Sequence, residues 1–171
     1  MTKQKQELSE RLVEGYNAML TRAGEALHHG EQGVKQAIDK AMQKSSDLGE
    51  LSREEAERVG DYLRRDLTDA ARFINNSGKE LGDWLRFDLT AVEMGLGQLF
   101  AKAVDQTRLA LTDLELRATA LGEWHSGEVV GIGTLQCKSC GEVLHFHNTS
   151  HIPPCPKCHG TSYRRLSTSN A

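Results

Sequence analysis

The residues with the clearest chemical potential are four cysteines near the end of the chain. The sequence has 171 residues, and its four cysteines form two C-x-x-C pairs separated by 14 residues. Four thiolates that converge tetrahedrally provide the closed shell of a structural zinc site, which leaves no position for a substrate. The sequence therefore predicts one zinc ion per chain, bound by Cys137, Cys140, Cys155 and Cys158.

The expected compartment decides how these cysteines are interpreted. The opening MTKQKQELSE is too polar for a secretory signal peptide, and no run of about 18 apolar residues is present to span a bilayer. We therefore expect a cytoplasmic protein, in which cysteines stay reduced and closely spaced pairs serve as metal ligands. Bound iron, a redox-active dithiol, and a site of three cysteines and one histidine are the alternatives.

Short segments with the pattern of β-strands surround the two cysteine pairs. They are VVGIGTLQ (129–136), EVLHFH (142–147) and SYRRL (162–166). The apolar residues available for a core here are Val143, Phe146, Ile152 and Tyr163, which are too few to fold without the metal. Gly141 and Gly160 follow the two pairs, and we expect them to provide backbone freedom at each turn. Four nearby histidines are expected at the surface or in support of the ligands: His145, His147, His151 and His159.

The rest of the chain has an eleven-residue period typical of long helices. Apolar residues recur at spacings of 4, 4 and 3 over residues 8–41, and again over 59–118. The pattern predicts a first helix that ends near Lys44 and a second that starts after Ser52, whose spacing to Glu55 matches a capping box. The segment NNSGKE (75–80) has turn residues, but the apolar stripe keeps its register there, which favours a continuous helix.

These lengths predict an elongated architecture. Helices of about 40 and about 70 residues would measure roughly 60 Å and 105 Å. The fold class expected is mainly α: a long antiparallel helical hairpin or coiled coil over residues 1–122, followed by a small rubredoxin-like β zinc ribbon over 123–171. Because the longer helix would be partly unpartnered, we expect a homo-oligomer formed through the helical region. We also expect loss of zinc to unfold the ribbon and spare the helices.

Aromatic residues widen the apolar stripe in the second predicted helix. Tyr62, Phe73 and Trp84 are eleven residues apart, and Phe87 follows one turn later. Such rows are most often core, so we favour packing against the first helix or a second copy. A docking surface for another protein is the alternative.

The layout as a whole resembles a known family. A charged helical body followed by CKSCGEVLHFHNTSHIPPCPKCHGTSYRR is similar to the proteobacterial zinc-ribbon-containing proteins of unknown function, the YbeL-like family. The resemblance implies that the four cysteines bind zinc. It implies no activity.

The residues do not indicate an enzyme. The sequence has no P-loop, H-E-x-x-H or G-x-S-x-G motif. A di-iron bundle needs two Glu-x-x-His motifs, and the helical part has one, at Glu25 to His28. We therefore expect a non-catalytic adaptor whose zinc ribbon binds another macromolecule, most often a protein.

Two other functions are kept as alternatives. A nucleic-acid-binding ribbon would use Lys138, Lys157, Arg164 and Arg165 with Phe146 and Tyr163 as stacking residues. The net charge of −3 does not suggest nucleic-acid binding, because proteins that bind nucleic acids usually carry a clear basic stripe. Amphipathic helices that coat a membrane or polymer surface are the second alternative, although acidic residues outnumber basic ones in the helical part.

Overall fold

The computed structural model describes residues 3–28, 33–87, 92, 94–109 and 123–166. These residues form five helices, α1 (Lys3–His28), α2 (Val34–Asp47), α3 (Arg53–Ser77), α4 (Leu81–Leu85) and α5 (Met94–Leu109). They also form six strands, β1 (Trp124–His125), β2 (Val129–Val130), β3 (Gly133–Cys137), β4 (Val143–Phe146), β5 (Ser150–His151) and β6 (Ser162–Arg165). The expected fold class, mainly helical with a small C-terminal β region, is confirmed.

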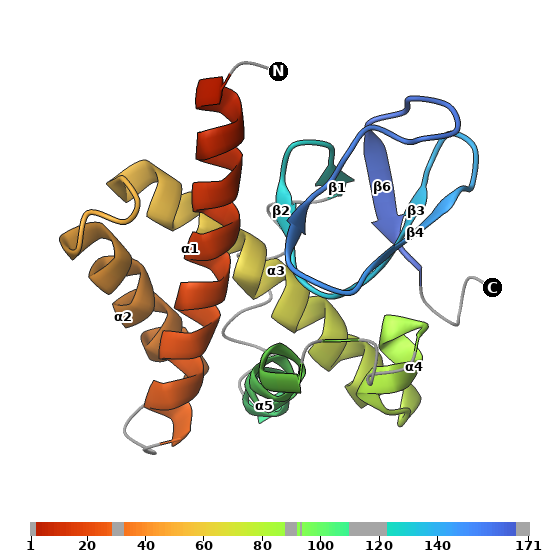
Figure 1. Cartoon of the computed structure of the whole chain (residues 1–171). Coiled ribbons are helices and arrows are strands. Elements are labelled where there is room, and N and C mark those ends of the chain that lie inside the picture. Colours follow the sequence, from red (N-terminus) through yellow and green to blue (C-terminus); the bar gives the residue numbers. More distant parts are fainter. Residues whose placement is uncertain (1–2, 29–32, 88–91, 93, 110–122, 167–171) are drawn as a thin grey trace.

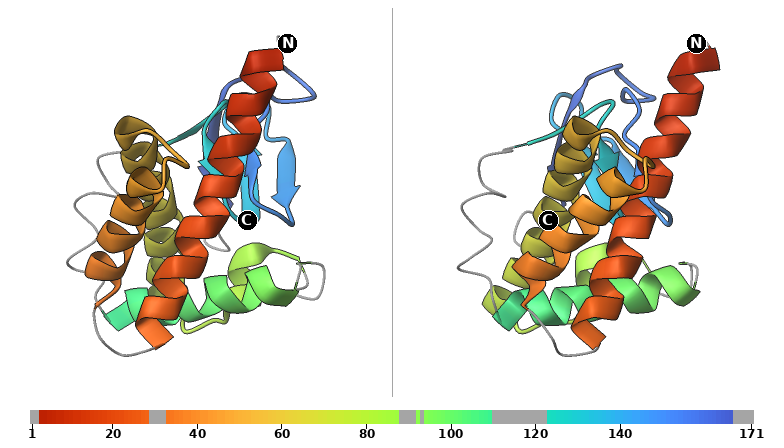
Figure 2. Two further views of the ribbon diagram at one scale, coloured as in Figure 1. Left: turned by 60° about the vertical axis from the view of Figure 1, so that its left-hand side comes forward. Right: turned by 90° about the vertical axis from the view of Figure 1, so that its left-hand side faces the viewer.

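The helices pack around α3 rather than extending as a rod (Figure 1). Helix α2 runs back beside α1, α5 crosses α1 and α3, and the short α4 lies past the end of α3, where it contacts both α3 and β3. Figure 2 shows the β region seated against one side of this helical body. Among the described residues, no helix is both long enough and apolar enough to cross a membrane.

The prediction of two uninterrupted long helices is wrong. Gly33 has an extended backbone (φ −72°, ψ 165°) immediately before α2, so the first predicted helix is divided between α1 and α2. Gly78 adopts a left-handed φ of 68° and ends α3, where the sequence favoured continuity. The chain therefore folds back on itself, and the part of the predicted second helix beyond residue 109 lies outside the described residues.

Other local predictions are confirmed. The Ser52 hydroxyl accepts a hydrogen bond from the Glu55 amide at 3.1 Å, and the Glu55 carboxylate accepts one from the Ser52 amide at 2.8 Å. This capping box begins α3. Most described positions of the eleven-residue stripe are also buried, although in a different architecture. They include Tyr16, Met19, Ala23, Ile38, Val59, Leu63, Leu67, Ala70, Phe100 and Ala103.

The β region consists of two antiparallel sheets. The larger has the strand order β1-β6-β3-β4, and the smaller pairs β2 with β5. Tyr163 on β6 lies opposite Cys137 on β3, so a strand pair leads directly into the first cysteine turn. Of the expected small core, Phe146, Ile152 and Tyr163 are buried, whereas Val143 is half-buried.

A buried carboxylate on α3 joins the helices to the β region. Asp66 is fully buried and accepts hydrogen bonds from the Tyr16 hydroxyl (2.7 Å), the Gly131 amide (2.8 Å) and the Arg165 guanidinium (3.0 Å). The Trp124 indole N–H is also within 3.3 Å. Burial and the adjacent Asp66 raise the pKa of Tyr16 well above its usual value, so its phenol stays a proton donor. Four separate segments therefore meet at one side chain.

Arg165 is held at this junction by two indole rings and two carboxylates. Its Cζ lies 4.5 Å from the centre of the Trp84 ring and 4.8 Å from that of Trp124, so the cation is sandwiched between two indoles. Its Nε is 3.2 Å from Asp69, which also accepts a hydrogen bond from Trp84. The arrangement fixes β6 against α3 and α4.

Gly131 explains part of the sequence GIG between β2 and β3. A Cβ atom at this position would lie 2.5 Å from the Tyr16 hydroxyl oxygen, closer than real Cβ contacts allow. The glycine therefore lets the backbone amide approach Asp66 beside Tyr16. The motif serves contact between the two parts of the chain.

We predict that replacing Arg165 is far more damaging than replacing its neighbour. Arg165→Met would leave the buried Asp66 without its cation, which costs about 3–5 kcal/mol of unfolding free energy. Arg164→Met is the matched control, because Arg164 is exposed and bonds the Gln136 side chain, so its cost should stay within about 0.5 kcal/mol. Urea unfolding followed by circular dichroism measures both, and equal losses would contradict the proposed importance of the junction.

Candidate metal centre

The two cysteine pairs lie on turns with the same backbone pattern. In the first, the Gly141 amide donates to the Cys137 carbonyl (3.0 Å), and the Cys137 amide donates to the Glu142 carbonyl (2.8 Å). In the second, the His159 amide donates to the Cys155 carbonyl (2.8 Å), and the Cys155 amide donates to the Gly160 carbonyl (2.8 Å). Each turn therefore presents its two sulfurs on one side.

The glycines after the two pairs have different roles. Gly141 has a left-handed φ of 82°, as expected, but in the second turn His159 takes this conformation (φ 63°). At Gly160 the constraint is space, because a Cβ would lie 3.2 Å from the Cys158 sulfur and 3.3 Å from the Cys137 sulfur. Its amide also points at Cys158 Sγ, at 3.4 Å.

The four sulfurs form a compact cluster of metal-binding size. All lie within 4.8 Å of one another. The Cys137–Cys158 and Cys140–Cys155 Sγ distances are both 3.6 Å, far longer than a disulfide bond of about 2.05 Å. Sulfurs placed tetrahedrally at about 2.3 Å from zinc would be roughly 3.8 Å apart, so the donor set fits one zinc ion.

The electrostatics of the cluster favour a bound cation. The amides of Cys140 and Ser139 point at Cys137 and lower the pKa of its thiol to about 6. The Gly160 amide acts in the same direction on Cys158, but the neighbouring thiols outweigh it and raise the pKa of Cys158 to about 12. Because neighbouring thiolates oppose one another's ionisation, a divalent cation is needed to hold all four in the charged form.

Tyr163 supports the cluster from inside the ribbon. Burial, together with the charges of Cys155 and Cys137, raises the pKa of Tyr163 to about 12. The hydroxyl therefore remains protonated and donates to the Pro153 carbonyl at 2.8 Å, two residues before Cys155. This bond ties the second turn to β6.

The four basic residues named from the sequence are divided by the structure. Lys138 and Lys157 are exposed on the cysteine turns, near Glu123 and Glu142 respectively. Arg164 is exposed on β6. Arg165 is buried in the junction with Asp66, so it is wrong as a surface contact.

The four aromatic residues named as a possible docking surface do not form one. Trp84 is fully buried and Tyr62 nearly so, while Phe73 packs partly buried on the same core. Phe87 is half-buried and its ring meets those of His145 and His147 edge-on. The packing interpretation therefore describes these residues, with contacts made inside one chain.

The sequence analysis missed the junction residues Asp66 and Trp124. A signal for Asp66 was present, because it lies three residues after Leu63 and four before Ala70, on the apolar face of α3. A charged residue at such a position is rarely buried unless it is paired. Nothing in the sequence identified Arg165 as its charged partner, because Arg165 lies 99 positions away.

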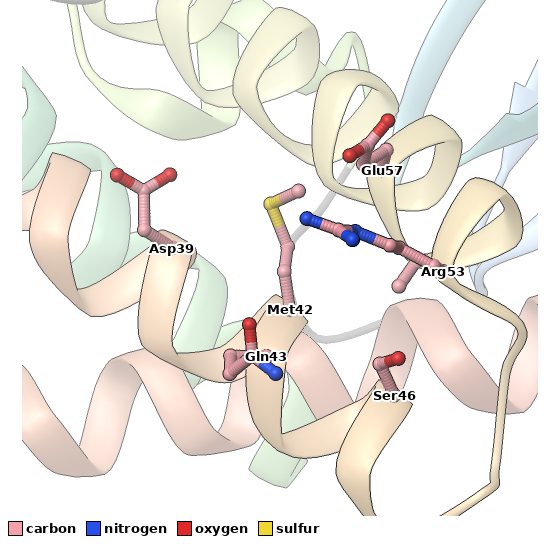
Figure 3. Close-up of a pocket in the computed structure, with 7 residues that line it drawn as sticks. Asp39, Met42, Gln43, Ser46, Arg53 and Glu57 are labelled. Carbon is pink, nitrogen blue, oxygen red and sulfur yellow. The ribbon is translucent and has the colours of Figure 1, made fainter.

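A pocket lies between α2 and α3, away from the cysteines (Figure 3). Its volume is about 340 Å³, and its lining residues are Asp39, Met42, Gln43, Ser46, Arg53, Ala56 and Glu57. Acidic and basic side chains face it together, and the nearby Asp39 is already paired with Arg64. Among the described residues, the cysteine cluster is the one group with the donors and spacing of a metal site.

A hairpin of β3 and β4 around one cysteine turn, with a second cysteine turn leading into β6, defines a zinc ribbon, here carried on a helical body. Comparison with known proteins agrees: the model of a family described as a zinc-ribbon containing domain matches residues 21–167. The uncharacterized protein YbeL of Escherichia coli K12 is 30% identical over 159 residues, which cover 91% of this chain and 96% of YbeL. YbeL proteins of the O157:H7 and O6:H1 strains match equally well.

The chain therefore belongs to this zinc-ribbon family, and its four cysteines bind one zinc ion. No solved structure matches it. The names of the relatives describe no activity, so membership of the family supports the metal site and indicates no activity.

We predict that zinc loss destabilises the helices as well as the ribbon. Cys155→Ser with Cys158→Ser should reduce the zinc content from one ion per chain to none. Because Arg165 and Trp124 bind Asp66, we expect the helical signal to melt at a lower temperature in the same variant. Metal analysis and circular dichroism test this.

His159→Asn is the control, because His159 lies beside the ligands and outside the cluster, and asparagine tolerates its left-handed backbone. It should retain one zinc ion and an unchanged helical melting temperature. Helices that melt normally in the zinc-free variant would restore the expectation, drawn from the sequence, that the two parts fold separately.

Proposed function

We propose that the chain is a non-catalytic, cytoplasmic adaptor whose zinc ribbon binds another protein. The observation that carries this proposal is the way the ribbon is mounted. Arg165 enters the helical body on one side, and neighbouring side chains on a strand point to opposite faces. Arg164 therefore points outward, together with the exposed cysteine turns that carry Lys138 and Lys157.

The metal site supports a binding role rather than catalysis. Four cysteines complete the tetrahedral shell of zinc, so the ion cross-links the two turns and has no open position for a substrate or water. The side chains that hold the ion thus serve to shape the outer surface of the ribbon. That surface is the natural place for a partner.

The nucleic-acid alternative receives less support from the same residues. Phe146 and Tyr163, which would have to stack on bases, are buried. Arg165 is committed to Asp66, and Lys138 lies beside an acidic side chain. A protein partner needs neither exposed stacking residues nor a basic stripe.

The other expectations drawn from a long exposed stripe also lose their basis. A surface coat and self-association through the helices both required an apolar face without a partner inside the chain. Most of the described stripe residues pack against other helices and against Val129 and Ile132 of the ribbon. The proposal therefore rests on the ribbon.

Affinity capture with a surface variant tests the proposal. The tagged protein and its Lys138→Glu, Lys157→Glu, Arg164→Glu variant are recovered from the native cells, and bound proteins and nucleic acids are identified. We expect a defined protein to be lost from the variant while zinc content stays at one ion per chain. The matched control reverses three exposed lysines of α2, Lys35, Lys40 and Lys44, and should retain that protein.

The other outcomes are equally informative. Nuclease-sensitive material that disappears with the ribbon charges would support the nucleic-acid alternative. Identical binding by all three versions would contradict a role for this face and assign recognition to another surface.

A further inference from the structure

His151 makes an unusual pair of contacts where the ribbon meets α1. Its Nδ1 lies 2.9 Å from the Gly127 carbonyl oxygen, and its Nε2 lies 2.8 Å from the Ser9 carbonyl oxygen. Both partners are acceptors only. A neutral imidazole carries one N–H and can therefore bond one of them, leaving a nitrogen lone pair facing the other oxygen.

The geometry satisfies both contacts only when the ring carries two protons. We propose that His151 is a proton-dependent latch, in which the imidazolium fastens the first turns of α1 to the ribbon and the neutral ring releases them. This inference is independent of the partner proposed above, because it concerns a contact within the chain. Release of the latch breaks the contact between His151 and α1 only, and the hydrogen bonds of Asp66 remain intact.

The cleft that contains His151 is lined by acidic side chains. Glu10 and Glu14 on α1 line the same cleft as His151, and no lysine or arginine is among its described lining residues. On the ribbon side, the carboxylate of Glu128 is bonded to Arg65 and lies beside His125. Arg11, on the same stretch of α1, is directed to Glu55 on α3. The cation thus lies among acceptors and carboxylates.

Apart from the ion pair of Arg11 with Glu55, the part of α1 that the latch holds has little other support. Residues 3–11 of α1 are exposed except for Ser9, which is half-buried at the His151 contact. Farther along the helix, the Thr149 hydroxyl bonds the side chain of Asn17, and Tyr16 bonds Asp66. Loss of the His151 contact should therefore loosen residues 3–11 while the rest of α1 stays docked.

The direction of the pH effect follows from these contacts. Only a ring protonated at both nitrogens bonds both carbonyl oxygens, so the latch is made in more acidic solution and weakened in more alkaline solution. Bonds to a charged donor are among the stronger hydrogen bonds of proteins. We expect amide exchange over residues 3–11, corrected for its intrinsic pH dependence, to be on the order of tenfold slower at pH 6 than at pH 8.

The test uses the zinc-loaded full chain. Hydrogen exchange by mass spectrometry at the two pH values is compared for the wild type, His151→Gln and His147→Gln, with zinc content measured at each pH. His147 is the matched control, because it is an exposed histidine of the same ribbon. The glutamine at 151 should abolish the pH difference over residues 3–11, and the glutamine at 147 should preserve it.

Nuclear magnetic resonance of the imidazole nitrogens provides a second readout that does not depend on a variant. At pH 6 the latch requires protons on both ring nitrogens of His151. A single protonated nitrogen there would overturn the proposal, as would a pH difference in exchange that persists in His151→Gln or vanishes in His147→Gln.

Discussion

The carboxylate of Asp66 imposes the main constraint on this structure. A buried charge is tolerated only when it is paired and hydrogen-bonded, and here the required donors come from α1, β6, the β2–β3 connection and Trp124 on β1. None of these groups is close to Asp66 in the sequence. The helices and the ribbon must therefore assemble before the charge is compensated. The junction thus favours the correctly folded chain over arrangements in which Asp66 is buried without these donors.

The zinc site and this junction depend on each other through β6. Tyr163 faces the cysteine turns, whereas Arg165, two residues later, reaches Asp66. A ribbon with so small a core needs its metal to hold β6 in place. In return, Trp84 and α3 cover the inner side of the ribbon, whereas Lys138, Lys157 and Arg164 are exposed among the described residues. Metal binding and helical packing are thus linked through β6, which carries both Tyr163 and Arg165.

The stripe of apolar residues illustrates how far a sequence pattern can be followed. Positions such as Tyr16, Leu63 and Phe100 were expected on a buried face, and they are buried. The same pattern suggested two long helices, because a helix has the same period whether its apolar face meets a second copy or another helix of its own chain. The backbone conformation at Gly78, and not the stripe, determined where the chain turned.

By itself, the sequence determined the metal ligands, the strands β2, β3, β4 and β6, the capping box of α3 and most of the buried positions. Each depends on spacing within a short segment, where bond geometry and helical or strand periodicity leave few possibilities. Only the tertiary structure decided that Arg165 is buried while Arg164 is exposed, that Trp84 packs on Arg165, and that His151 lies between two carbonyl oxygens. These properties depend on groups brought together from distant parts of the chain, and local patterns carry no information about which distant groups will meet.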